Sequence, residues 1–165
     1  MKQQHKDMGF TLIELLVAIV ILIILTATAL PSYRSFMTGQ RIKNASFDIM
    51  SSLILARSEA TKRNSNVDVI PNGGNWVNGW TVAVGATTLK TRSALGNGVS
   101  ITCYSGGVAA ACAAITFISS GQVSGFSAPS IQIVSNDSST ATGFGMRCIN
   151  LDLSGRPNSK KSTCQ

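Results

Sequence analysis

Histidine and charged side chains are scarce in this sequence, which has one histidine and 13% charged residues among 165. The histidine, His5, lies in an N-terminal stretch that any leader processing would remove. Ser-His catalysis, histidine-ligated zinc and histidine pH switching all need an imidazole, so the sequence argues against each of them. The acidic residues are dispersed, and no glycine-rich phosphate loop is present. We therefore expect no enzymatic activity, no cofactor and no metal site.

Cysteine is absent from the first 102 residues, and the four that follow are Cys103, Cys112, Cys148 and Cys164. The absence of any Cys-x-x-Cys spacing disfavours metal binding and favours disulfides in an oxidising compartment, such as a periplasm or the cell exterior. Four cysteines allow three pairings. Short loops favour Cys103 with Cys112 and Cys148 with Cys164.

The apolar residues, 44% of the chain, are concentrated in residues 10–30, FTLIELLVAIVILIILTATAL. As a helix these 21 residues would span roughly 30 Å, the thickness of a bilayer core, which predicts a transmembrane helix. A cleavable secretory signal ending at Ala27-Thr28-Ala29 is the alternative. It is disfavoured because Glu14 interrupts the run, Asp7 dilutes the basic start and the helical pattern continues beyond Ala29.

Glu14 is the single charge in this apolar run. A carboxylate costs on the order of 2 to 3 kcal/mol at mid-bilayer, and less near the end of a span, so Glu14 should have a partner or a function. A cut between Gly9 and Phe10 would create an α-amine four residues before Glu14. The same amine on a neighbouring subunit could pair with this carboxylate in a helical bundle. We interpret Glu14 as the residue that sets subunit register.

The sequence Met8-Gly9-Phe10-Thr11-Leu12-Ile13-Glu14-Leu15-Leu16 resembles the class III signal of type IV pilins and pseudopilins. In that family a short charged leader ends in Gly, Phe follows, and Glu is the fifth residue of the mature chain. The resemblance implies that a prepilin peptidase removes the leader, residues 1–9, after Gly9 and N-methylates Phe10.

Residues 31–66 continue as an amphipathic helix, with apolar side chains at helical spacing. The stripe consists of Ile42, Ala45, Ile49, Leu53, Ala56 and Ala60, which Met50 and Ile54 widen. Pro31 predicts a kink near the membrane surface. Glu59 is placed to pair with Arg63 at i,i+4. The cations outside the stripe, Arg41, Lys43, Arg57, Lys62 and Arg63, are expected to form a solvated face, and Asn64 and Asn66 to end the helix.

Residues 67–165 read as a β-rich globular domain. Short β-type runs lie at residues 67–70, 80–84, 99–104, 115–118, 131–134 and 146–153, separated by Gly, Ser, Asn and Thr. Residues 135–145 lack large aliphatic side chains and predict a loop. The expected class is α+β, the type IV pilin fold, in which the long helix packs on an antiparallel sheet.

Further motifs resemble the GspH/FimT group of minor pilins and pseudopilins. They are Leu55–Ala60 with Lys62 and Arg63, Trp76 and Gly79-Trp80 before a strand, Ile115–Phe117 with Gly121, and Arg147-Cys148 through Gly155-Arg156 to Cys164. The resemblance implies a subunit that helps to initiate or cap a type IV pilus, or the pseudopilus of type II secretion. Its partners would be other major and minor pilins, prepilin peptidase and, before assembly, inner-membrane lipid. The resemblance therefore implies a single-pass inner-membrane protein with a periplasmic domain, which is later exposed on the cell surface in the filament.

The C-terminal tail is the basic part of the domain, since its last 19 residues hold Arg147, Arg156, Lys160 and Lys161 against Asp152 alone. The FimT branch includes members that bind DNA through a Gly-Arg-x-Arg motif in this tail. Gly155-Arg156-Pro157-Asn158 matches its first two required positions and lacks the second arginine. Double-stranded DNA is therefore a second candidate partner, and Trp76 and Trp80 are interpreted as core residues rather than base-stacking ones.

Overall fold

The protein is described by a computed structural model that covers residues 10–125, 129–136 and 145–164, with the backbone alone for residues 29–32. The chain divides into two compact units, Met1–Ser35 and Phe36–Gln165. Helix α1 (Leu12–Arg63) runs through both of them. The bend expected at Pro31 stays a prediction.

The first unit is the apolar start of α1. Thr11 caps it: its hydroxyl accepts from the Glu14 N–H at 3.3 Å, and its own N–H donates to Glu14 Oε2 at 3.4 Å. This reciprocal pair is a capping box. Thr26 and Thr28 donate their hydroxyls to carbonyls one turn back, so their polar groups are satisfied within the helix. In the described part of the chain, α1 is the one helix long and apolar enough to cross a membrane.

The second unit is built around the C-terminal part of α1. All six residues of the predicted stripe are buried, with at most 3% exposure, which confirms the interpretation of this face. The stripe is narrower than expected, because Ile54 is 53% exposed while Met50 is only partly buried. Ile54 was therefore wrongly assigned to the buried face.

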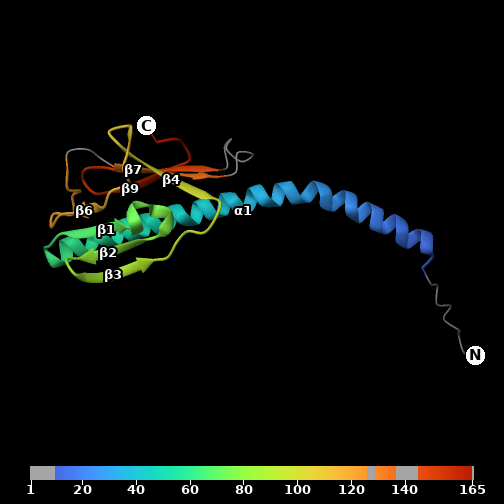
Figure 1. The fold of residues 1–165 in the computed structure, drawn as a ribbon, viewed down its shortest axis with the longest axis horizontal. Coiled ribbons are helices and arrows are strands. Elements are labelled where there is room, and N and C mark those ends of the chain that lie inside the picture. Colours follow the sequence, from blue (N-terminus) through green and yellow to red (C-terminus); the bar gives the residue numbers. More distant parts are fainter. Residues whose placement is uncertain (1–9, 126–128, 137–144, 165) are drawn as a thin grey trace, which may run out of the picture. The chain divides into compact units, whose positions relative to one another are not determined.

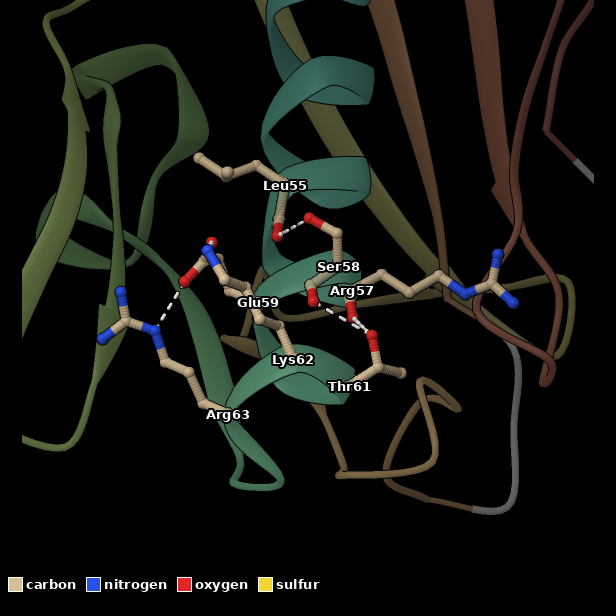
Figure 2. Close-up of polar contacts among 7 residues, drawn as sticks. All are labelled: Leu55, Arg57, Ser58, Glu59, Thr61, Lys62 and Arg63. Carbon is tan, nitrogen blue, oxygen red and sulfur yellow. Dashed lines mark hydrogen bonds and ion pairs between the residues drawn. The ribbon is translucent and has the colours of Figure 1, made fainter.

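Helix α1 ends at Arg63, directly before Asn64, the first of the two asparagines expected to end it. Asn64 follows in the left-handed conformation, at φ 49°, which is a common way to end a helix. The predicted pair between Arg63 and Glu59 is confirmed. Figure 2 shows this pair on one side of the helix and Arg57 pointing to the other side. The hydrogen bond from Arg63 lowers the pKa of the Glu59 carboxyl.

The strands form two antiparallel sheets rather than the single sheet expected from the sequence (Figure 1). The first sheet has the order β3-β2-β1-β6. Its strands are β1 (Val67–Pro71), β2 (Trp80–Val84), β3 (Thr87–Arg92) and β6 (Ile115–Phe117). Two short 3-10 turns, η1 (Asn72–Gly74) and η2 (Trp76–Asn78), connect β1 to β2. Strand β3 was not predicted.

The second sheet has the order β5-β4-β7-β8-β9. Its strands are β4 (Val99–Ser105), β5 (Val108–Ala110), β7 (Pro129–Ser135), β8 (Met146–Leu151) and β9 (Pro157–Lys160). Neither β5 nor β9 was predicted. Most of the predicted loop 135–145 lies outside the described residues.

One hydrophobic core joins the helix stripe to both sheets. Trp76 and Trp80 are both buried in it, with ring centroids 5.6 Å apart, which confirms that they are core residues. Because α1 contributes to a core shared with both sheets, the core packs the helix and the two sheets of the second unit against one another.

Two disulfides fasten the second sheet. Cys103 is bonded to Cys112 and Cys148 to Cys164, the pairing with the shorter loops. The second bond ties the chain end to β8, and Cys164 also donates its N–H to Gln132 Oε1 at 3.3 Å.

Candidate functional site

The N-terminal assembly segment is the first candidate site. Gly9 lies outside the described residues, and Phe10, at 86% exposure, begins them. Glu14 is exposed in the first turn of α1, and no other acidic residue lies between it and Asp48 in the sequence. The capping box satisfies the Glu14 carboxylate only with long contacts at its own helix end. In this position, at the start of the apolar part of α1, the helix dipole also favours an anion.

The second candidate site is a shallow groove of about 810 Å³ between α1 and the β8–β9 hairpin. Phe47 and Met50 of α1 form one wall. The other wall comes from the hairpin and consists of Arg147, Asn150, Leu151, Asp152, Arg156, Pro157, Asn158, Ser159 and Lys160. The lining therefore carries three cations against one carboxylate, which makes it suited to an anionic ligand.

The turn between β8 and β9 is organised by Asp152. Its Oδ1 accepts from the Ser154 hydroxyl and from the Arg156 N–H, each at 2.7 Å. These hydrogen bonds, with that of Ser154 the larger effect, lower the pKa of the Asp152 carboxyl. The carboxylate is thus engaged with the turn and holds the backbone of Arg156, whose side chain is exposed.

Gly155 in this turn is required for packing. Its φ is +80°, and a Cβ placed there would lie 2.1 Å from the carbonyl oxygen of Gly121. The same carbonyl accepts from Arg57 Nε at 3.1 Å. Arg57 was expected on a solvated face, but it bonds instead to the loop that packs against this turn. The glycine of the Gly155-Arg156 motif therefore has a structural role.

The helix wall of the groove was not anticipated from the sequence. Lys43 Nζ lies 5.8 Å from the centroid of the Phe47 ring, and Phe47 is 54% exposed. Ser46 and Ser159 join this wall to β9 through their hydroxyls, 2.9 Å apart. Positions 43, 47 and 50 are three or four residues apart, so they lie on one face of the helix, beside the buried stripe. This spacing was the one sequence signal that could have indicated the helix wall of the groove.

The four cations predicted to bind DNA are thus only partly brought together. Arg147, Arg156 and Lys160 line the groove, while Lys161 follows β9 and is not among the lining residues. Arg147 Nη1 reaches Ser159 Oγ at 3.5 Å. Trp76 and Trp80 are buried and therefore cannot stack on bases.

No cluster of metal-ligating side chains occurs among the residues that the structure describes. A cleft of about 450 Å³ opens between the sheets. Its lining holds no charged side chain.

Comparison with known proteins places the chain among pilins. The family model described as type II transport protein GspH matches residues 45–155, and that of the prokaryotic N-terminal methylation motif matches residues 7–30. The minor pilin FimU of Pseudomonas aeruginosa is similar in structure, with a TM-score of 0.63 and 16% identity over 79% of this chain and 96% of that chain. The minor pseudopilin EpsH of the Vibrio cholerae type 2 secretion system is also similar, with a TM-score of 0.52 and 14% identity over 73% of this chain and 96% of that chain. No curated protein sequence matches.

A long N-terminal helix that packs on antiparallel sheets and begins within a methylation motif defines a type IV pilin-like protein. More particularly, the chain belongs to the GspH family. Its apolar N-terminal helix and methylation motif are those of a membrane-anchored pilin that is assembled into a surface filament. The family and the two solved relatives are structural pilin subunits, and such minor pilins and pseudopilins assemble with other pilin subunits.

Proposed function

We propose that this chain is a minor pilin that takes part in initiation and tip assembly of a type IV pilus. The observation that supports this most directly is the methylation motif at residues 7–30, which includes the start of a helix whose apolar side chains are exposed from Leu12 to Leu25. Such a surface needs lipid or other helices around it. The helix first lies in the inner membrane and then enters the filament, where neighbouring helices replace the lipid around it. Assembly therefore requires no covalent step beyond leader processing.

Processing prepares the assembly segment. A prepilin peptidase cleaves after Gly9 and methylates the new N-terminus at Phe10, four residues before Glu14. The α-amine of an adjoining subunit then pairs with the Glu14 carboxylate as the helices enter the filament. The two disulfides suit a domain that reaches its fold in the periplasm.

Mass spectrometry of the purified native protein tests this proposal. We expect N-methylated Phe10 as the first residue, because the peptidase acts at Gly9 and leaves the apolar helix attached. A mature chain that begins at Leu30 would show secretory cleavage after Ala29 instead. That result would remove the anchor and overturn the proposal.

A deletion strain separates pilus assembly from the related function in type II secretion. Loss of surface pili without loss of exported enzymes would support a role in pilus assembly. Normal pili with impaired export would instead assign the chain to a secretion pseudopilus.

DNA binding in natural transformation is a second candidate function, favoured by the groove. Arg147, Arg156 and Lys160 line one surface, so a phosphate backbone could contact all three. Three phosphate contacts to duplex DNA give a slope of log K against log salt of roughly −3. Binding by a single domain is then weak, and repetition along a filament would be needed for stable capture.

The salt dependence of DNA binding tests this candidate. We expect Arg156→Ala to weaken binding of duplex DNA by the full-length protein in detergent and to reduce the salt slope by about one, since one phosphate contact is lost. Lys62→Ala is the matched control, because it removes an exposed cation on α1 that does not line the groove. Equal losses in both variants would show that only net charge matters and would contradict a site in the groove.

A further inference from the structure

Strand β5 has a backbone edge that faces away from its own sheet. It pairs with β4 through a two-residue turn, Gly106-Gly107, with Ser105 opposite Val108 and Tyr104 opposite Ala109. The pair that flanks such a turn is the hydrogen-bonded one, so Tyr104 and Ala109 form the non-hydrogen-bonded pair. The N–H and C=O of Ala109 therefore point outward, and within the described residues no backbone hydrogen bond to Ala109 is found outside the sheet.

The strands next to this edge carry no charged residue. Residues 93–136, a run of 44, contain no Asp, Glu, Lys or Arg, and β4, β5, β6 and β7 all lie within that run. Val108 is 70% exposed, and Ala109, Ala110 and Ala111 are exposed as well. Natural proteins protect free edges with charged residues or proline, because an unprotected edge pairs with other strands.

The other outer strands are protected in these ways. Strand β3 carries Lys90 and Arg92, and β9 carries Pro157 and Lys160. The outer side of β6 is already bonded, since the Ser124 N–H donates to the Thr116 carbonyl at 2.8 Å. Among the described strands, β5 is thus the edge strand without protection by charge, proline or pairing.

A cleft lies beside this edge. It has a volume of about 450 Å³. Its walls include Ala110 and Ala111, the end of β4 and the start of β6, with the buried Trp76 also lining it. Side chains alternate across a strand, so every second residue of an added strand would point toward one face of this sheet. Small, uncharged side chains suit a cleft of this composition.

We propose that β5 is a β-augmentation site for an extended, uncharged segment of a different pilin-like subunit in the same filament. The inference rests on the proposed function as a filament subunit. A strand of three residues offers few hydrogen bonds. The contact therefore forms once packing of the apolar helices has raised the local concentration of the partner.

The partner is a different subunit and not a second copy of this chain. Pairing of β5 with another β5 is isologous, which closes a dimer and leaves no edge for the next subunit. The remaining outer strands of a second copy are charged, proline-containing or already bonded. The uncharged surface around β5 likewise matches a partner segment without charge.

Photo-crosslinking in piliated cells tests the proposal with the full chain. A photoreactive phenylalanine analogue replaces Val108, and the captured protein is identified by mass spectrometry. We expect a different pilin-like subunit. Capture of a second copy, or of no pilin-like subunit, would overturn the proposal.

Two proline variants show whether the outward N–H is used. Ala109→Pro should lower the crosslink yield roughly threefold to tenfold, the effect of about one backbone hydrogen bond. Thr88→Pro is the matched control, because Thr88 holds the same position after the two-residue turn between β2 and β3, opposite Ala83. Ala109→Lys, which leaves the backbone unchanged, should reproduce the loss. An undiminished yield in Ala109→Lys would refute the site even if the proline variant misfolds.

The Glu14→Val variant separates this inference from the proposed function. If Glu14→Val fails to enter filaments while Ala109→Pro and Ala109→Lys enter and crosslink normally, the β5 site is wrong and the filament role stands. If Glu14→Val also enters filaments normally, the proposed function itself is contradicted.

Discussion

Glu14→Val is expected to reduce entry of this subunit into filaments at least about tenfold, because the α-amine of its neighbour would be buried in the helical bundle without a partner. The folded domain should be unaffected, since Glu14 lies in the first unit of the chain, outside the hydrophobic core. Immunoblots of sheared filaments measure the first effect. Thermal unfolding in detergent measures the second, with an expected change within about 0.5 kcal/mol.

Glu14→Gln separates the two roles that the structure allows for this side chain. Glutamine at this position still completes a capping box with Thr11 but carries no charge. If the ion pair between subunits matters, Gln should fail as Val does. Normal assembly of the Gln variant would show that capping of the helix is sufficient, and the proposed pairing would be wrong.

Gly155→Ala is expected to destabilise the domain by roughly 3 kcal/mol, which combines the left-handed backbone penalty with overpacking. The added Cβ would lie 2.1 Å from the Gly121 carbonyl oxygen and 3.3 Å from Arg57 Nε. For a domain of this size the unfolding temperature should fall by roughly 10 °C. Circular dichroism during heating of the full-length protein in detergent measures this.

Two controls distinguish packing from a role of the Gly-Arg motif in DNA binding. Gly85→Ala also places alanine at positive φ, +56°, but with no atom within 4 Å, so it should cost only about 1 kcal/mol. Arg156→Ala should leave stability within about 0.5 kcal/mol, since its side chain is exposed. A Gly155→Ala variant as stable as Gly85→Ala would contradict the packing argument.

The sequence predicted the parts of the fold that local pattern determines. The stripe from Ile42 to Ala60 was correct because helical spacing records which face is buried, and Trp80–Val84 was placed correctly because β-branched and aromatic residues mark a buried strand. The three missed strands, β3, β5 and β9, all lie at sheet edges. An edge strand is paired on one side and poorly buried, so its own sequence carries little alternation.

Long-range contacts were beyond sequence reasoning. The division into two sheets depends on β6 pairing with β1 and β7 with β4, which no local pattern specifies. The cations of the tail could be grouped from the sequence because β8 and β9, which carry or flank them, are close in sequence. The helix wall of the groove was missed because Ser46 and Ser159, which join the two walls, are 113 positions apart.

Each covalent cross-link joins a strand of the second sheet to a nearby segment, and the first sheet has none among the described residues. Under mechanical load, the loops closed by Cys103–Cys112 and Cys148–Cys164 cannot extend, whereas the hairpins of the first sheet can peel from the helix. A subunit stretched in a single-molecule experiment should therefore lengthen first through β1 to β3. Its fully extended contour should grow further only after reduction, by the 9 and 16 residue steps that the two bonds enclose.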